Sequence, residues 1–107
     1  MKRIGVARES DLTIVTQENG SWTRDEALTG KAPECLAVDP RRPERWYCGT
    51  FGHGVWRSDD GGLSWSPVGE GITEPQIMSV AVSPDGAWLA ASSEDRVVRL
   101  WRLSITR

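Results

Sequence analysis

The feature that most constrains this sequence is an internal repeat. Residues 11–22 (DLTIVTQENGSW) align with residues 54–65 (GVWRSDDGGLSW) without a gap, at an offset of 43. A second match, at an offset of 44, pairs LAVDP at 36–40 with VAVSP at 80–84. It continues with RWYCGT at 45–50 against AWLAAS at 87–92. Such a repeat predicts similar units that stack and bury their apolar faces against one another.

Within the repeat, the segments have the pattern of short β-strands. Runs of β-branched, aromatic and small residues lie between turns rich in Gly, Pro, Asn and Asp, and no segment shows an extended helical stripe. The sequence therefore predicts an all-β protein with antiparallel sheets. The expected strands are 3–7, 12–16, 21–28, 34–39, 45–50, 54–58, 63–68, 77–83, 87–92 and 96–103.

A period of about 40–45 residues with four strands is typical of a β-propeller blade. When the strands are labelled A to D from the propeller axis outward, residues 1–30 supply strands B, C and D. Residues 31–72 supply a complete blade, and residues 73–107 supply strands A, B and C. The expected fold is a single partial β-propeller over residues 1–107, with about two and a half four-stranded antiparallel blades. Because propellers close with roughly four to eight blades, we expect further blades to be needed.

The segment SDDGGLSW resembles the Asp-box, the S-x-D-x-G-x-[ST]-W element of BNR repeats in sialidase-like propellers. The resemblance implies a structural role in the hairpin between strands C and D. In that hairpin, Asp60 and Ser58 are expected to accept backbone N–H groups. Asp59 occupies a free position of the pattern, so its replacement is expected to cost little. The residues that match the Asp-box are Ser58, Asp60, Gly62, Ser64 and Trp65.

The last third of the chain resembles a WD40 repeat. Residues 78–103 contain an SPDG hairpin, a small-residue strand and a VRLW ending. Ser92 (or Ser93), Asp95 and Trp101 lie where that family places parts of its polar network. Arg102 stands in place of the Asp of the WD dipeptide, and no Gly-His precedes the strand. The resemblance implies a blade with an incomplete side-chain network.

Charge and hydropathy exclude several classes of partner. The net charge of −2 argues against nucleic acid. No window is apolar enough for a membrane span, and the N-terminus lacks the apolar stretch of a secretory signal. We therefore expect a cytoplasmic protein without a membrane partner. The one local arginine cluster is interpreted as a solvated turn in which acidic residues offset the charge. It comprises Arg41, Arg42 and Arg45, with Asp39 and Glu44 beside them.

Cys35 and Cys48 lie in two apolar runs on either side of a turn. If the runs form a hairpin, a disulfide is geometrically possible. Two buried free thiols are favoured in a cytoplasmic chain.

The sequence predicts no catalytic, cofactor or metal site. Tyr47 is expected to pack in a strand, and His53, between glycines, to occupy a turn. The Asp59/Asp60 pair is interpreted as part of a turn. The six tryptophans are expected to recur at equivalent blade positions and to pack between blades. They are Trp22, Trp46, Trp56, Trp65, Trp88 and Trp101.

The sequence favours a non-enzymatic interaction or assembly module. We expect its open ends to be completed by a homo-oligomer, with a dimer favoured, or by another propeller chain. The alternative is a fragment of a BNR-type, sialidase-like glycoside hydrolase or of a carbohydrate-binding propeller. Sialidase-like catalysis draws an arginine triad, a Tyr–Glu pair and an acidic residue from many blades. No such set is assigned in this chain.

Overall fold

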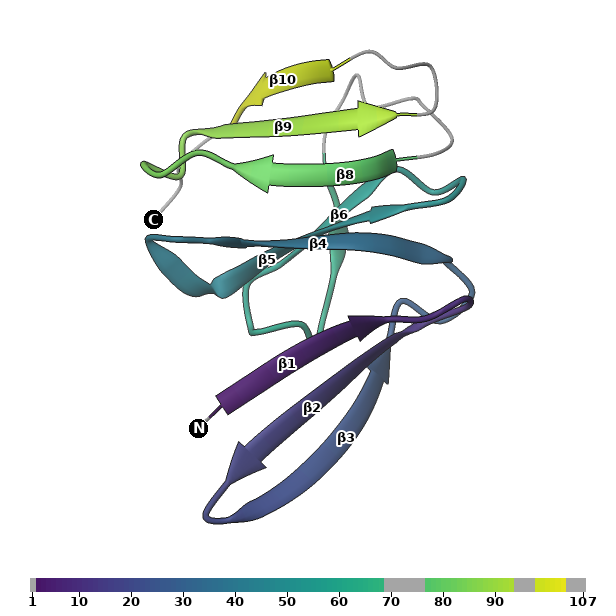
Figure 1. Ribbon diagram of the computed structural model, residues 1–107, viewed down its shortest axis with the longest axis vertical. Coiled ribbons are helices and arrows are strands. Elements are labelled where there is room, and N and C mark those ends of the chain that lie inside the picture. The colour runs from purple at the N-terminus through teal and green to yellow at the C-terminus, as the bar shows by residue number, and fades with distance from the viewer. Residues whose placement is uncertain (1, 69–76, 94–97, 104–107) are drawn as a thin grey trace.

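The computed structural model describes residues 2–68, 77–93 and 98–103, and their regular structure consists of strands (Figure 1). The described residues form no helix, so none is long and apolar enough to cross a membrane. The all-β prediction is confirmed. The strands are β1 (Lys2–Ala7), β2 (Leu12–Glu18), β3 (Ser21–Ala27), β4 (Pro33–Asp39), β5 (Arg42–Thr50), β6 (Val55–Ser58), β7 (Ser66–Pro67), β8 (Ile77–Val82), β9 (Trp88–Ser93) and β10 (Val98–Arg102).

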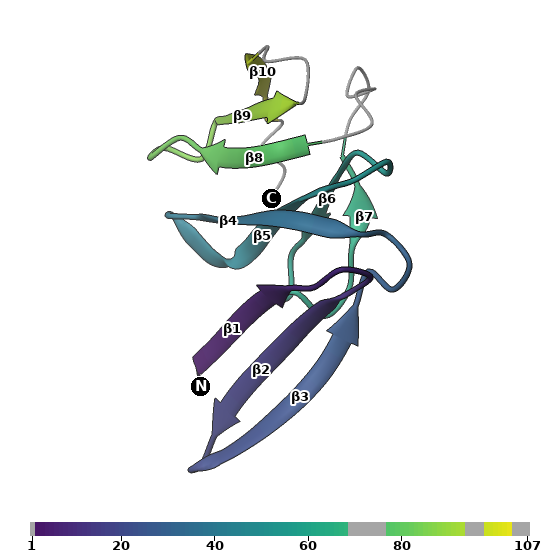
Figure 2. The ribbon, with the colours of Figure 1, turned by 45° about the vertical axis from the view of Figure 1, so that its right-hand side comes forward.

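These strands form three antiparallel sheets. The N-terminal sheet has the order β1-β2-β3, the central sheet β4-β5-β6-β7, and the C-terminal sheet β10-β9-β8. In Figure 1 the sheets are stacked along the longest axis of the molecule, with the central sheet between the other two, and Figure 2 shows β6 and β7 more clearly. The molecule measures 43 × 31 × 19 Å. Each outer sheet therefore has one face turned toward the central sheet and one face turned away.

The hairpin between β2 and β3 closes with a two-residue turn. Asn19 and Gly20 have φ values of 54° and 79°, as a type I′ turn requires. The turn fixes the register that places Glu18 opposite Ser21. The corresponding hairpin of the central sheet has a longer connection, because β6 ends at Ser58 and β7 begins at Ser66. The expected strand over 63–68 is thus wrong for its first residues, whose N–H groups are bound by a side chain described below.

Two apolar cores join the sheets. The first lies between the N-terminal and central sheets and contains the buried residues Leu12, Ile14, Ala27 and Trp46. The second lies between the central and C-terminal sheets and contains Tyr47, Val55, Ile77, Leu89, Ala91 and Leu103. Trp46 and Tyr47 are neighbours in β5 and enter different cores, because successive side chains of a strand point to opposite faces. The central sheet is therefore buried on both faces.

The register of the sheets corrects one part of the repeat. Val38 is opposite Trp46, and Val82, its equivalent 44 residues later, is opposite Leu89. The equivalent of Trp46 is therefore Leu89. The alignment of RWYCGT with AWLAAS predicted Trp88 as the equivalent, and this prediction is wrong. The β8–β9 connection is one residue shorter than the β4–β5 connection, which shifts the alignment. Trp88 consequently lies on the outward face. Trp88 and Trp22 are 40% and 53% exposed, so the expected packing between sheets of the chain is wrong for these two tryptophans.

The two cysteines are free thiols, as the sequence favoured. Cys35 is opposite Gly49, whereas Cys48 is opposite Leu36. Because these are successive pairs of the ladder, the two side chains point to opposite faces of the sheet. Burial raises the pKa of Cys35 and raises that of Cys48 to about 12. Both thiols are therefore protonated at neutral pH.

We predict that the Tyr47 hydroxyl contributes nothing to stability. Tyr47 is fully buried, and its hydroxyl makes no hydrogen bond of good geometry. Burial, the largest effect, raises its pKa, and the nearby Arg57 guanidinium only partly offsets that rise. Tyr47→Phe should leave the free energy of unfolding unchanged or raise it by up to about 1 kcal/mol. Tyr47→Ala should lower it by about 3–5 kcal/mol through loss of packing. Urea unfolding followed by circular dichroism measures both, and a clear loss of stability in Tyr47→Phe would contradict the prediction.

Candidate functional site

The loop between β6 and β7 is organised by the side chains of Ser58 and Asp60. Asp60 Oδ1 accepts the backbone N–H groups of Leu63 and Ser64 at 3.0 and 2.9 Å. It also accepts the Ser58 hydroxyl at 2.7 Å, while Oδ2 accepts the hydroxyl of Ser64. Ser58 Oγ in turn accepts the N–H of Gly62 at 2.8 Å. The carboxylate thus satisfies donors of its own loop, which is why β7 starts late.

The same loop is clamped against the N-terminal sheet. Gly61 and Gly62 have φ values of 75° and 97°, which favour glycine. A Cβ at Gly62 would lie 2.9 Å from the ring of Trp46. Trp65 donates its indole N–H to the Gly62 carbonyl at 2.7 Å and packs on the first core. Arg3 of β1 donates to the carbonyl of Asp60 at 2.9 Å. The loop therefore joins two sheets.

Asp59, at a position that the Asp-box pattern leaves open, contacts two arginines outside the loop. Its two carboxylate oxygens accept Arg45 Nε at 2.8 Å and an Arg57 guanidinium nitrogen at 3.1 Å. The side chain of Arg45 is only 9% exposed, so the interpretation of the arginine cluster as a solvated turn is wrong for this residue. Burial alone would raise the pKa of Asp59, but hydrogen bonds from the two arginines outweigh it and lower the pKa.

The environment of Asp60 does not suit an acid catalyst. Partial burial favours a higher pKa, but hydrogen bonds from Ser64, Ser58 and Leu63 outweigh it and lower the pKa to about 2. The carboxylate is therefore ionised near neutral pH and has no proton to donate. Its lone pairs already bind donors of the loop. The geometry supports a structural use of this carboxylate.

The residues of the WD40-like segment do not form one cluster in the described part of the chain. Ser92 shares a hydrogen bond of 2.8 Å with Ser79, and Trp101 packs half-buried on the second core. Ser92 is opposite Val98 and Trp101 opposite Leu89, which places them on opposite faces of the sheet. Asp95 lies outside the described residues.

His53 lies in a turn, as expected, and the described residues contain no metal-binding group. His53 is exposed in the β5–β6 turn, and its backbone carbonyl accepts the indole N–H of Trp56 at 2.8 Å. No group of three or more His, Cys, Asp or Glu side chains among the described residues is arranged to hold a metal ion.

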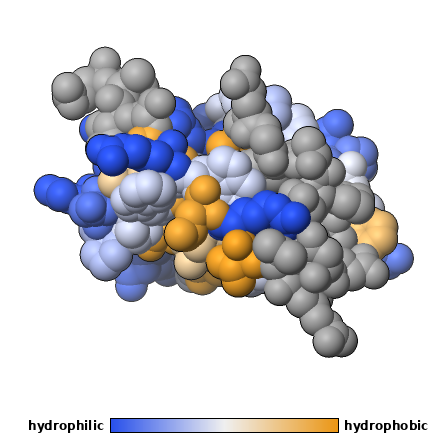
Figure 3. Space-filling model, turned by 90° about the horizontal axis from the view of Figure 1, so that it is seen from above, coloured by the Kyte–Doolittle hydropathy of each residue, from blue (hydrophilic) through white to orange (hydrophobic). Residues whose placement is uncertain are grey.

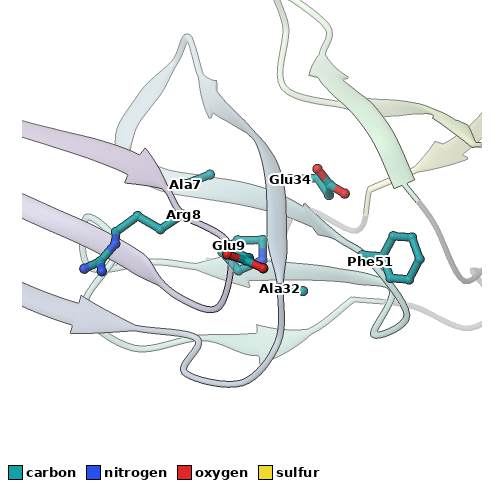
Figure 4. A pocket seen from close by; sticks show the side chains of 7 residues that line it. Ala7, Arg8, Glu9, Ala32, Glu34 and Phe51 are labelled. Carbon is teal, nitrogen blue, oxygen red and sulfur yellow. The ribbon is translucent and has the colours of Figure 1, made fainter.

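A pocket of about 450 Å³ lies where three connections meet (Figure 4). Phe51, Glu9 and Glu34 supply its aromatic ring and its two carboxylates, and Phe51 is exposed. Arg8 extends away from the rest in Figure 4, toward its ion pairs with Asp11 and Glu26. No sequence pattern predicts this pocket, because its residues come from three separate segments: the end of β1 with the turn after it, the start of β4, and the β5–β6 turn. Its lining is Ala7, Arg8, Glu9, Ala32, Pro33, Glu34 and Phe51.

A second pocket, of about 330 Å³, lies between the β4–β5 and β8–β9 connections. Its carboxylates already bind their own turns: Asp39 accepts the N–H of Arg41 at 2.8 Å, and Asp85 accepts the Ser83 hydroxyl at 2.7 Å and the N–H of Ala87 at 3.0 Å. It is lined by Asp39, Arg41, Arg42, Arg45, Asp85 and Gly86. Arginine and aspartate charges nearly balance, so the pocket has no strong preference for an anion or a cation.

The faces of the two outer sheets that point away from the central sheet carry large exposed apolar side chains. We call them the N-face and the C-face. Figure 3 looks onto the C-terminal sheet and shows hydrophobic side chains gathered near the middle of the view, among hydrophilic ones. The N-face carries Ile4, Val6 and Trp22, and the C-face carries Trp88, Val98 and Leu100.

Comparison with known proteins supports a propeller-like fold. The sequence pattern of the family "WD domain, G-beta repeat" matches residues 65–102, which confirms the WD40 resemblance of the last third. The structure is similar to an ancestral GH74 enzyme, with a TM-score of 0.59 and 23% identity over 81% of this chain and 12% of that one. It is also similar to a candidate 6-phosphogluconolactonase from Bacteroides uniformis, with a TM-score of 0.64 and 17% identity over 90% of this chain and 32% of that one. The chain spans well under half of either protein. The family match and the two structural similarities do not test the Asp-box resemblance, which stays a prediction.

We predict different costs for the two adjacent aspartates. Asp60→Ala removes the acceptor of two backbone donors and two hydroxyls and should lower the free energy of unfolding by about 2–3 kcal/mol. Asp59→Ala leaves Arg45 without its partner, but its carboxylate is more than half exposed, so the loss should be about 1 kcal/mol. Chemical denaturation of both variants measures the difference. Equal losses would contradict the separate roles assigned here.

We also predict a pH dependence that comes from Asp60. Its pKa of about 2 in the fold lies below the ordinary value of 3.8. The ionised carboxylate therefore stabilises the fold above about pH 4, and this contribution is lost as the pH falls toward 2. Asp60→Asn keeps an acceptor oxygen but no charge, so its thermal midpoint should fall less steeply between pH 5 and about 2 than that of the wild type. Parallel slopes in thermal scans would show that Asp60 is not the titrating group.

Proposed function

We propose that the chain is a segment of a β-propeller that acts as a non-enzymatic interaction or assembly module. In this proposal the three sheets are successive blades: residues 1–30 contribute strands B, C and D, residues 31–72 a complete blade, and residues 73–107 strands A, B and C. Further blades are supplied by self-association or by another propeller chain. The propeller-like structural neighbours and the WD40 match support the fold on which this proposal rests.

The observation that carries the proposal is the pair of apolar outward faces. Two sheet-to-sheet contacts inside the molecule bury aliphatic and aromatic side chains, and burial of such surface is the main favourable contribution to packing. On the N-face and the C-face, side chains of the same kind are 40% to 66% exposed. Contiguous exposed apolar surface indicates a place where another surface binds.

The use of the loop carboxylates supports a non-enzymatic role. Asp59 binds two arginines, and Asp60 binds four donors of its own loop. Neither is available to activate water or to protonate a leaving group. The partner in this proposal is a protein chain. The net charge of −2 does not favour nucleic acid, and the proposal includes neither a membrane partner nor a secreted location.

A second candidate function is carbohydrate binding, or the role of one segment in a larger glycoside hydrolase. The observation that favours it is the pocket in Figure 4, whose lining includes the exposed Phe51 and the carboxylates of Glu9 and Glu34. An aromatic face with carboxylate acceptors is suited to a sugar ring and its hydroxyls. In such a segment the remaining catalytic groups would come from other blades.

We predict no turnover of glycosides by the isolated chain. A panel of fluorogenic sialosides and common glycosides should give no signal above the buffer. Any signal is tested with Glu9→Gln, Glu34→Gln and, as a matched variant outside the pocket, Glu18→Gln. Turnover that is lost in one pocket variant and retained in Glu18→Gln would overturn the non-enzymatic proposal. Binding of a glycan without turnover, abolished by Phe51→Ala, would establish the carbohydrate-binding candidate instead.

A further inference from the structure

We propose that the N-face of one chain docks on the C-face of a second copy, so that copies associate head to tail. This inference rests on the proposed assembly function and names both the partner and the two surfaces. It follows from equivalent register positions in the three sheets. In two series of equivalent positions, Ile4/Trp46/Leu89 and Val55/Val98, the side chain is buried where a neighbouring sheet covers it and exposed where none is described.

The N-face is the equivalent of a surface that the molecule already buries. One series of equivalent positions consists of Ile4, Trp46 and Leu89. Their ladder partners follow one another at intervals of 43 residues, so the three residues hold the same position in their hairpins. Trp46 is 6% exposed against the N-terminal sheet, and Leu89 is 0% exposed against the central sheet. Ile4 is 53% exposed. The partners are Val15, Ser58 and Trp101.

The C-face shows the same relation from the other side. Val55 of the central sheet and Val98 of the C-terminal sheet are 43 residues apart and hold equivalent ladder positions, opposite Gly49 and Ser92. Val55 is 2% exposed because the C-terminal sheet covers it, whereas Val98 is 66% exposed. A valine at this position is therefore buried where the next sheet covers it and exposed where no further sheet is described.

Side-chain sizes at the centre of each contact are compatible with the head-to-tail pairing. Between the first two sheets, Trp46 packs over Gly5, where a Cβ would lie 2.7 Å from its ring. Between the next two sheets the equivalent residues are Leu89 and Tyr47, which share one core. In the proposed contact, Ile4 of one copy would meet the equivalent of Gly5 and Tyr47, which is Ala90 of the other. Ala90 is opposite Leu100, as Gly5 is opposite Ile14 and Tyr47 opposite Arg57.

The C-face also replaces an ion pair by a more apolar pair. In the central sheet, Arg45 and Asp59 form a contact of 2.8 Å beside the second core. The residues 43 positions later are Trp88 and Arg102, and the guanidinium of Arg102 lies 5.7 Å from the centre of the Trp88 ring. Trp88 therefore adds an aromatic ring to the C-face at a position where the central sheet has an arginine. This change enlarges the surface available to a second copy.

The test uses charge substitutions on the two faces and their mixture. Wild type, Ile4→Lys, Leu100→Lys and the control Leu63→Lys are compared by sedimentation velocity across a concentration series. Leu63 is an exposed leucine in the β6–β7 loop and lies on neither face. The wild type and the control should exceed the chain mass of 11.8 kDa. Each face variant should have a dissociation constant raised about ten-fold or more, since a lysine would be buried without a partner.

Mixing the two face variants identifies the geometry. Ile4→Lys retains an intact C-face and Leu100→Lys an intact N-face, so the mixture should associate although neither variant does so alone. A wild type that stays at 11.8 kDa at every concentration would overturn the inference, while the proposed module could still bind another propeller chain. Loss of association in only one variant, or no recovery on mixing, would overturn the head-to-tail pairing in favour of like faces. Circular dichroism of each variant shows that the fold is retained.

Discussion

The packing of one sheet face on the next is the interaction on which the rest of this structure depends. Trp46 shows how tightly it is fitted: its ring lies over Gly5 of β1 and Gly62 of the β6–β7 loop, where a Cβ at either glycine would come within 3 Å. The same β5 strand sends Tyr47 into the other core. Because one strand contributes to both cores, the three sheets are not independent units, and a change in its register would disturb both contacts.

The loop of Ser58–Trp65 serves this packing. Its carboxylate and hydroxyls bind the N–H groups that a strand would have paired, which lets the backbone turn and leaves Trp65 against the first core. Asp60 acts within the loop, whereas Asp59 reaches outward to hold a largely buried arginine of β5. Asp59 and Asp60 therefore have different neighbours, although they are adjacent. Their contacts do not support the hypothesis of a catalytic pair.

Much of the fold could be predicted from the sequence because its strands are marked by local chemistry. Turn residues bound them, and the Asn19–Gly20 turn fixes a hairpin register directly. The errors arose from one long-range contact and from two local details of turns that the hydrophobic pattern does not show. Asp60 shortens β7, and Arg45 becomes buried through a partner 14 residues away. The one-residue difference between two turns moves Trp88 to the outward face. The pocket at Phe51 combines residues from three separate segments and has no sequence signature.

Side-chain size varies between equivalent positions of the repeat. The N-face and the C-face therefore differ in detail from the sheet contacts inside the molecule, although both remain apolar. Equivalent positions hold Gly5, Tyr47 and Ala90 on one side of a contact, and Ile4, Trp46 and Leu89 on the other. Inside the molecule the smallest residue meets the largest, while Tyr47 meets a leucine in the next core. Packing at native density requires such compensation between facing positions. The residues of the series on the two outward faces are the partly buried Ala90 and the exposed Ile4. Their combined size is moderate, which is compatible with packing of one face on the other.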